Sequence, residues 1–474
     1  MKNKQSAKPA RDQRYREQRH RWTPLLQRIQ PDAAGIDCGA EHHYVAVPPD
    51  RDERPVRAFR TFTAELNQLA GWLIQCRIKT VAMESTGVYW IPVFEILETR
   101  GIEVVLVNAH HLHNVRGRKS DITDCEWLRE LHSVGLLNAS FRPAAEIVVL
   151  RTYLRQRASL VEQASSHIHR MQKSLTQMNL MLHLVLSDIT GATGLKIVRR
   201  ILDGERDPAA LAAHRDPRCK ASTQEIIAAL TGNYRVEHLF TLKQNFDAYE
   251  FECQQIGECD SAIQKLIDTL ASQQPPPTTE LPSVRHPLRP KRHDPSFDIR
   301  TPLHRLTGGA DLSQIDGIGP HAALQLVAEI GTDMSRWLSA AHFTSWLSLA
   351  PNNKISGGRL LSSRTPPSAN RAAAILRRCA MSLMRTSTAL GAFYRRLAAR
   401  TGKPTAITAT ARKLALLVYR VLRGDITYCD PGANAYAQLH RTRLLKSLSK
   451  RAHQLGHALV DLSTGEILHP HKVS

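Results

Sequence analysis

The stretch Ala33-Ala34-Gly35-Ile36-Asp37 is a short apolar run that ends in an acid. A run of this length bounded by polar residues is typical of a buried strand. Residues 43–47 and 57–62 follow with alternating apolar and polar side chains, the pattern of neighbouring strands. The folded part of the chain therefore begins with a three-stranded meander whose first strand carries a carboxylate at its end.

Helical and strand patterns alternate after this meander. They occupy 64–76 (helix), 80–83 (strand), 88–99 (helix), 103–107 (strand) and 124–134 (helix). Three strands followed by helix, strand, helix, strand and helix is the element order of the RNase H fold. We therefore predict an α/β RNase H-like domain over residues 31–143.

The charge of the chain indicates its class of partner. Its 474 residues include 64 Lys and Arg against 43 Asp and Glu, a net charge of +21, and such an excess favours a polyanion such as nucleic acid. Aromatic residues make up 5%, too few for base stacking to dominate binding. No apolar run reaches the ~18 residues of a membrane span, so we expect no membrane association. The eight cysteines form no Cys-x-x-Cys pair, which favours reduced thiols in a cytoplasmic protein.

Four further segments flank or follow the predicted sheet domain. Residues 1–30 carry nine Lys and Arg and are expected to form a disordered arm that contacts phosphates, or a merely solvating tail. Residues 144–274 contain two heptad series, 150–185 and 239–270, which predict coiled-coil helices paired within one chain or between chains. Residues 275–310, rich in proline and basic residues, are predicted to be a linker. Helical patterns then predict a mainly α domain over 311–474.

Four carboxylates are the first candidate site. Asp37 and Glu84 end the first and fourth predicted strands, which lie side by side and parallel in an RNase H-type sheet. Asp121 and Asp124 are one helical turn apart at a predicted helix start, so both can face the same edge. Clustered carboxylates repel one another unless cations neutralise them, and oxygen ligands suit Mg²⁺, of which two ions about 4 Å apart can promote phosphoryl transfer. The alternative roles are helix capping and a turn.

Two glycine-containing segments are weaker candidates. Residues 315–320 place Gly317 and Gly319 before a helical run, which resembles a helix-hairpin-helix contact to the DNA backbone or an ordinary helix connection. Residues 349–358 contain Ser356 before Gly357-Gly358, and a serine hydroxyl in such a loop can attack a phosphodiester. Taken alone, a Ser-Gly-Gly segment is usually only a loop.

Together these segments resemble DEDD-type insertion-sequence transposases of the one-ten family, which includes the Piv/MooV-like DNA invertases. The resemblance covers about residues 33–380. Its motifs are Gly35-Ile36-Asp37, Ala82-Met83-Glu84-Ser85-Thr86-Gly87, Lys119-Ser120-Asp121-Ile122-Thr123-Asp124, Asp316-Gly317-Ile318-Gly319, Leu349-Ala350-Pro351 with Ser356-Gly357, and Asn370-Arg371-Ala372 with Leu376-Arg377-Arg378. The sequence departs from the family at Ala369, where a glycine is usual.

The resemblance implies a fold, a site and partners. The fold would be a RuvC-like domain, a coiled coil and a C-terminal transposase domain with a catalytic serine. Asp37, Glu84, Asp121 and Asp124 would take the positions of the acidic tetrad, and Ser356 that of the nucleophile. The partners would be donor and target DNA, a structured guide RNA encoded by the element, and further copies of the chain in a homodimer or homotetramer. The protein would be cytoplasmic and nucleoid-associated in a prokaryote.

Three functions remain open at this stage. The leading one is a recombinase that cuts and rejoins DNA through a phosphoserine. The second is a RuvC-like structure-specific endonuclease that uses metal-activated water, and the third is a non-enzymatic nucleic-acid-binding protein. For the first, Ser356 needs a proton acceptor, yet the nearest acids in the sequence are Asp333 and Asp425. We therefore expect a composite site in which the serine meets the distant carboxylates on oligomerisation.

Overall fold

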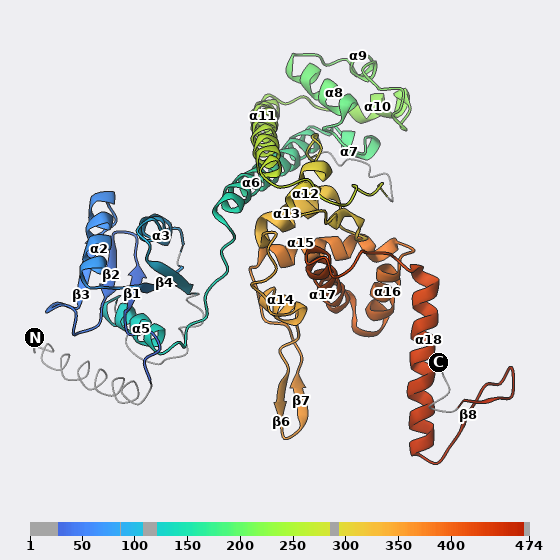
Figure 1. Cartoon of the computed structure of the whole chain (residues 1–474). Coiled ribbons are helices and arrows are strands. Elements are labelled where there is room, and N and C mark those ends of the chain that lie inside the picture. Colours follow the sequence, from blue (N-terminus) through green and yellow to red (C-terminus); the bar gives the residue numbers. More distant parts are fainter. Residues whose placement is uncertain (1–26, 86, 108–120, 285–292, 469–474) are drawn as a thin grey trace, which may run out of the picture. The chain divides into compact units, whose positions relative to one another are not determined.

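The computed structural model describes residues 27–85, 87–107, 121–284 and 293–468. It divides the chain into two compact units, Met1–Arg142 and Pro143–Ser474 (Figure 1). Nearly all of the predicted basic arm, residues 1–30, lies outside the described residues. Among the described helices, none combines the length and the apolar character needed to cross a membrane.

The first unit is a mixed sheet with helices on both faces. Its strands are β1 (Ala33–Cys38), β2 (His42–Ala46), β3 (Val56–Arg60), β4 (Thr80–Glu84) and β5 (Glu103–Val107), and its helices include α2 (Thr63–Gln75), α3 (Trp90–Thr99) and α5 (Asp121–Ser133). The strand order is β3-β2-β1-β4-β5, with β1 antiparallel to β2 and parallel to β4. The predicted order of elements and the adjacency of the first and fourth strands are confirmed.

The two faces of this sheet are covered by different helices. Leu69 of α2 and Leu97 of α3 pack with Ile36 and Met83 in one buried cluster. On the other face, Leu128 of α5 packs with Ala82 and Val107. Alternate residues of a strand point to opposite faces, so the side chains next to Ile36 and Met83 point towards α5.

A buried hydrogen bond joins the end of α5 to the start of β4. Thr80 Oγ1 and His132 Nε2 are 2.8 Å apart, and burial lowers the pKa of His132 to about 4. His132 is therefore neutral when the protein is folded, whereas in the unfolded chain it takes up a proton near pH 6.5. Acidification from about pH 6.5 to about pH 4 is expected to destabilise this unit by about 3 kcal/mol through His132 alone.

Chemical unfolding at a series of pH values checks this expectation. The variant His132→Gln retains an amide that can bond Thr80 but has no proton to gain in this range. Its free energy of unfolding should fall less steeply than that of the parent as the pH drops from about 6.5 to about 4. Equal slopes for the two proteins would show that His132 does not titrate differently in the folded and unfolded states.

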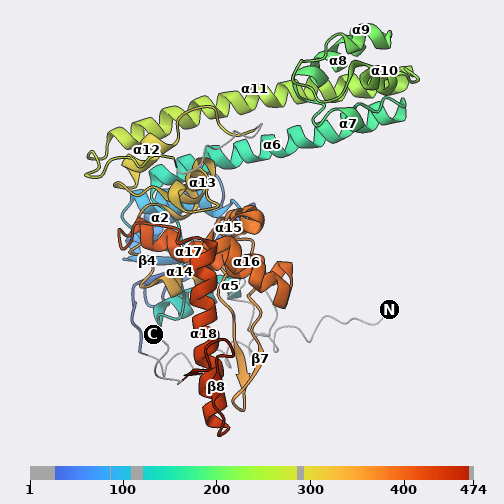
Figure 2. The same cartoon turned by 90° about the vertical axis from the view of Figure 1, so that its right-hand side faces the viewer.

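The second unit contains two long helices that lie side by side. Helix α6 (Ala145–Gln177) and helix α11 (Val236–Ser272) run antiparallel within one chain (Figure 2). Ser174 is paired with Thr241 at 3.0 Å, and Arg157 is paired with Asp260 near the other end. Of the two pairings left open by the heptads, the structure contains the one within the chain.

The first heptad series is shorter than the sequence predicts. Helix α6 ends at Gln177, and residues 182–185 form a separate short helix, α7 (Leu182–Val185). The chain then folds into α8 (Ala192–Leu202), α9 (Pro208–Ala212) and α10 (Thr223–Leu230) before α11 begins. The buried residues of these helices, among them Ile197 and Ile226, share a core with α6 and α11, and this burial outweighs continuation of the heptad.

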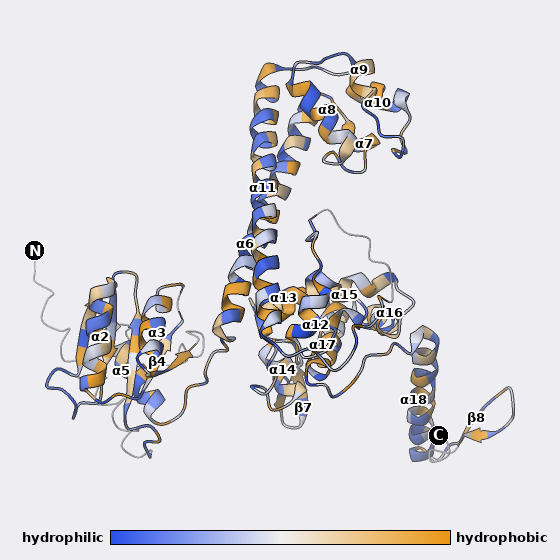
Figure 3. Cartoon of the chain, turned by 45° about the horizontal axis from the view of Figure 1, so that its top comes forward, coloured by the Kyte–Doolittle hydropathy of each residue, from blue (hydrophilic) through white to orange (hydrophobic). Residues whose placement is uncertain are grey.

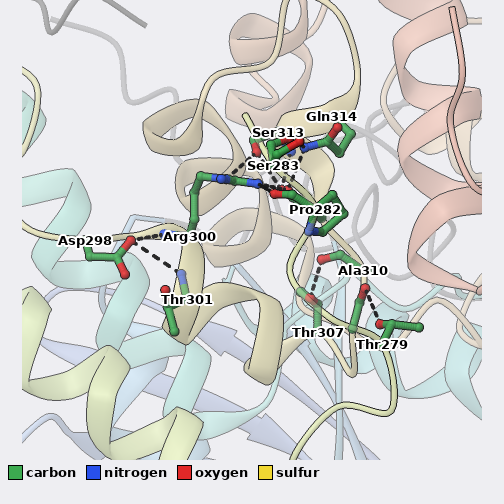
Figure 4. A network of polar contacts seen from close by, with 12 residues as sticks. Thr279, Pro282, Ser283, Asp298, Arg300, Thr301, Thr307, Ala310, Ser313 and Gln314 are labelled. Atoms are coloured by element: carbon green, nitrogen blue, oxygen red, sulfur yellow. Dashed lines mark hydrogen bonds and ion pairs between the residues drawn. The ribbon is translucent and has the colours of Figure 1, made fainter. Parts of the chain in front are cut away.

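The predicted linker, residues 275–310, is partly folded, which corrects that prediction. Helix α12 (Arg300–Leu306) packs against α11 and buries Leu303. The guanidinium of Arg300 donates to the carbonyl of Pro282 at 2.6 Å, to the carboxylate of Asp311 at 2.5 Å and to the hydroxyl of Ser313 at 3.1 Å (Figure 4). Proline and charge content alone does not reveal these contacts, because they join residues far apart in the sequence.

The rest of the second unit is mainly helical, as predicted. Its longer helices are α13 (Pro320–Ile330), α14 (Ala340–Trp346), α15 (Arg371–Ser382), α16 (Ala389–Thr401), α17 (Lys403–Leu422) and α18 (Gly432–Gln454). Helix α17 packs against α14, α15 and α16, and Leu414, Ala415 and Val418 of α17 are fully buried. A hairpin of β6 (Lys354–Ser356) and β7 (Arg359–Ser362) lies between α14 and α15, and a second hairpin of β8 (Leu459–Val460) and β9 (Ile467–Leu468) follows α18.

Candidate active site

Two of the predicted carboxylates lie next to each other at the edge of the first sheet. The parallel pairing of β1 and β4 runs from Ala33 opposite Thr80 to Ile36 opposite Met83. Asp37 and Glu84 are the next residues of these strands, so they are neighbours at the carboxyl ends. Because Ile36 and Met83 point into the cluster with α2 and α3, Asp37 and Glu84 point to the face that α5 covers.

The direction of α5 brings its first turn to the same edge. The last turn of α5 is at the start of β4, where His132 meets Thr80. The middle of α5 lies against Gly35 of β1, where an added Cβ would be 2.2 Å from the carbonyl oxygen of Cys125. Helix α5 is therefore antiparallel to β1 and β4, and its N-terminal turn lies towards the carboxyl ends of these strands.

Asp121 and Asp124 belong to this first turn. Helix α5 begins at Asp121, about one turn before the helix predicted over 124–134, and Asp124 is partly buried one turn later. The backbone of Asp121 is described, whereas its side chain lies outside the described part of the chain. The fold thus brings the segments that carry all four predicted carboxylates to one edge of one sheet.

Two buried thiols respond to the charges of this edge. Burial raises the pKa of Cys38, and the negative charges of Asp37 and Glu84 raise it further. Burial likewise raises the pKa of Cys125, with smaller contributions from the charges of Glu126 and Asp37. Both thiols therefore remain protonated, and the site has carboxylates as its anionic groups.

The donor set suits a hard cation. Carboxylate oxygens are the ligands that Mg²⁺ prefers, and adjacent carboxylates such as Asp37 and Glu84 are stabilised by a divalent ion. Within the described residues, no three His, Cys, Asp or Glu side chains are grouped closely enough to hold a metal ion. Asp37, Glu84 and Asp124 are partly buried, and their carboxylate oxygens suit such an ion by their chemistry.

Ser356 lies in the second unit, on an exposed hairpin. It is the last residue of β6, and Gly357 and Gly358 form the turn to β7 with φ of 54° and 72°. A two-residue turn with both φ positive is a type I′ geometry, which explains the two glycines. Ser356 pairs with Arg359 across the hairpin and is exposed to solvent. The serine expected in a flexible loop is therefore held in an ordered strand end.

Residues 315–320 were a candidate contact to the DNA backbone, but one of the two glycines in this turn has a packing role. Gly317 has a φ of 86°, and a Cβ there would lie 2.9 Å from the carbonyl oxygen of Cys379. Gly317 thus permits close packing against α15. Gly319 precedes the first turn of α13 with open space around it, but the nearby Asp316 carboxylate accepts a hydrogen bond from Tyr428 at 2.8 Å. A carboxylate at this point disfavours a phosphate.

Two residues of the site were not predicted from the sequence. Gly35 lets α5 approach β1, and the available signal was a glycine two residues before Asp37, on the same face of the strand. Arg359 places a cation directly opposite Ser356, and its signal was an arginine one residue beyond a Gly-Gly turn. Both roles depend on a close approach that the local sequence pattern does not specify.

Comparison with known families defines the class of protein. A transposase model of the DEDD type matches residues 34–180, which include the four carboxylates. The model described as Transposase IS116/IS110/IS902 family matches residues 309–395, which include Ser356. The protein is therefore a transposase, an enzyme that cuts and rejoins DNA.

The chain belongs to the IS110 family of insertion-sequence transposases. Both matches occur in the order that the sequence motifs predict, so the resemblance drawn from those motifs is confirmed. No curated protein matches the chain. Transposases of the DEDD type have an RNase H-like fold and use divalent metal ions.

Proposed function

We propose that this transposase cuts DNA by forming a covalent bond between Ser356 and a scissile phosphate, with Asp37, Glu84, Asp121 and Asp124 as the acidic tetrad. The observation that carries the proposal is the register of β1 and β4, which makes Asp37 and Glu84 neighbours on the face covered by α5. A bond forms between Ser356 Oγ and phosphorus while the bond to a deoxyribose oxygen breaks. The serine proton passes to a base and the leaving oxygen takes up a proton. Rejoining reverses these steps.

The tetrad would hold Mg²⁺. When bound, Mg²⁺ supplies positive charge that stabilises the charge developing on the phosphate oxygens. The protein's own part is to hold the carboxylates on rigid elements, with Asp37 and Glu84 on paired strands and Asp124 on α5. A carboxylate of this edge also accepts the proton that Ser356 must lose.

The hairpin supplies the nucleophile and a cation. Arg359 is directly opposite Ser356, and Lys354 begins the same strand as Ser356. A guanidinium at this position can bind the phosphate that Ser356 attacks and neutralise its charge. These cations attract a phosphate to Ser356, but none of them can accept the serine proton.

A complete site therefore requires residues of both units. The carboxylates belong to the unit Met1–Arg142 and Ser356 to the unit Pro143–Ser474. We infer a composite site assembled in a homodimer or homotetramer, with cleavage silent in the monomer. The net charge of +21 supports binding of nucleic acid. We propose donor and target DNA and a structured guide RNA as these partners, and a cytoplasmic location, because the family resemblance implies them.

Neutralising one carboxylate at a time tests the acidic tetrad. The variants Asp37→Asn, Glu84→Gln and Asp124→Asn preserve side-chain shape and remove the charge that a divalent ion needs. Each is expected to lower the rate of strand cleavage at least ~10²-fold while DNA binding persists. The rate is measured on a labelled DNA substrate with Mg²⁺ present.

The matched control is Glu103→Gln. Glu103 is exposed at the start of β5, at the opposite end of the same sheet, so this variant should cleave at the parent rate. Cleavage at the parent rate in Glu84→Gln would remove the tetrad from the mechanism.

A structure-specific nuclease is the second candidate. It is favoured by one observation, that the carboxylates at the ends of β1 and β4 both belong to the first unit, whereas Ser356 belongs to the second. In such an enzyme water would attack the phosphate, so no protein–DNA bond would form. A covalent adduct isolated after denaturation supports the recombinase, and cleavage without an adduct supports the nuclease.

A further inference from the structure

Helix α18 is strongly basic and lies outside both family matches, the second of which ends at residue 395. It contains no Asp or Glu, whereas its five Lys and Arg are Arg441, Arg443, Lys446, Lys450 and Arg451. These five side chains are exposed to solvent. Figure 3 shows that polar residues predominate along this helix, with apolar residues between them. The charged side chains of α18 are therefore all positive.

Three of these cations lie on one face of α18. Arg443, Lys446 and Lys450 are spaced by three and four residues, which places them above one another on a helix. Tyr436 and His440 precede Arg443 at the same spacing, and their rings stack at 6.4 Å. This face spans most of the helix. In its last two turns the charged side chains are Lys and Arg alone.

The same face continues onto α16 and α17. Arg396 of α16 donates a hydrogen bond from Nε to the hydroxyl of Tyr436 at 2.9 Å. Lys413 of α17 lies 4.5 Å from the ring centre of Phe393, which is in edge contact with Tyr436. Partial desolvation, and then the positive charges of Arg443 and Arg396, lower the pKa of Lys413. Three cations from three helices are thus close enough to repel one another.

No acid relieves this repulsion among the residues that the structure describes. None of the ion pairs found in the described ranges involves Arg396, Lys413 or Arg443. Of the acids that flank α18 in the sequence, Asp430 accepts a hydrogen bond from the backbone of Ala389, and Asp461 interacts electrostatically with Arg441, which is not part of this face. Like charges held together destabilise the folded protein unless an anion binds between them. An external polyanion would supply that charge.

We propose that Arg396, Lys413, Arg443, Lys446 and Lys450, together the α18 basic face, bind the phosphate backbone of duplex DNA. A helix presents such cations along a line, and duplex DNA presents phosphates in regular rows. The exposed apolar residues Leu444 and Leu448 lie on another side of α18, whereas Leu439 lies one turn before Arg443, so the basic face is polar from Arg443 onwards. The proposal rests on the transposase function only for the choice of DNA as the polyanion.

Equilibrium binding tests the proposal with three substitutions in one protein, Arg443→Gln, Lys446→Gln and Lys450→Gln. Binding of the full chain to a labelled DNA duplex is measured by fluorescence anisotropy without divalent ions, so that the result does not depend on cleavage. Affinity should fall at least about tenfold, and the slope of log affinity against log salt should become shallower by about two to three. Circular dichroism should be unchanged, because all three side chains are exposed.

The matched control removes three exposed lysines elsewhere in the second unit, with Lys173→Gln, Lys196→Gln and Lys265→Gln. It makes the same change in net charge and should keep both the affinity and most of the salt slope. An equal loss of affinity in the control would overturn the proposal, because it would show that DNA binding depends on net charge and not on this face. Unchanged DNA affinity in the triple variant would also overturn the proposal. Loss of binding to a folded RNA would then assign the face to RNA, and loss of self-association would assign it to a second copy of the chain. Cleavage defects in the tetrad variants have no bearing on this readout.

Discussion

Replacing Ser356 with alanine is expected to abolish the covalent protein–DNA adduct and to lower strand cleavage at least ~10³-fold. The substitution removes the hydroxyl that the end of β6 presents, and neither Arg359 opposite it nor the two turn glycines have a hydroxyl that could take its place. DNA binding should persist, because the side chain is small and exposed and makes no contribution to the core. Adducts are measured after denaturation on labelled DNA.

The matched control is Ser363→Ala, an exposed serine just beyond β7 of the same hairpin. This variant should form adducts at the parent level. Adducts that persist in Ser356→Ala would eliminate this serine as the nucleophile and would direct attention to another hydroxyl.

Mixing two inactive variants tests whether the site is shared between chains. Ser356→Ala retains the carboxylates and Asp121→Ala retains the serine, so a mixed oligomer would contain one intact composite site. Recovery of cleavage in the mixture is the result expected from the proposed assembly. Failure to complement, in variants that still form mixed oligomers, would confine the site to one chain.

Replacing Gly35 with alanine is expected to destabilise the first unit by about 3 kcal/mol and to abolish cleavage. The added Cβ would lie 2.2 Å from the carbonyl oxygen of Cys125, 2.5 Å from the amide nitrogen of Arg129 and 3.0 Å from Cβ of Leu128. Two of these atoms belong to the backbone, so α5 itself must shift. The shift would carry Asp121 and Asp124 away from Asp37 and Glu84.

Thermal unfolding and the cleavage assay together check this expectation, with Gly71→Ala as the control. Gly71 is inside helix α2, and the nearest atom to an added Cβ is Arg100 Nη1 at 4.0 Å. Alanine in a helix interior is favoured over glycine by about 0.5–1 kcal/mol, so this variant should be at least as stable as the parent and fully active. Parent stability in Gly35→Ala would contradict the close packing of α5 on β1.

Much of the first unit is predictable from local pattern. The expected strand at 103–107 has the bounds of β5, and the expected strand at 80–83 is one residue shorter than β4, which includes Glu84. Apolar alternation and helical spacing act over a few residues, so a strand or a helix can be read from its own segment. The acidic residues at the strand ends follow directly from these bounds.

The second unit shows where local pattern is insufficient. The heptad series continues to Val185, but α6 ends at Gln177 because the following residues are buried with α8 and α10 instead. Residues 300–306 form α12 although proline and basic residues surround them, because Leu303 is buried and Arg300 bonds to Asp311 and Ser313. In both places contacts between distant segments outweigh the local tendency.

By itself, the sequence determined the residues available for chemistry, their order along the chain, the element order of the sheet and the excess of positive charge. Only the tertiary structure decided that Asp37 and Glu84 are neighbours, that the first turn of α5 lies at their edge, and that Ser356 ends a strand opposite Arg359. The physical reason is that strand register and helix approach depend on burial and backbone contact between segments far apart in the chain. At Gly35 a single missing side chain allows that contact.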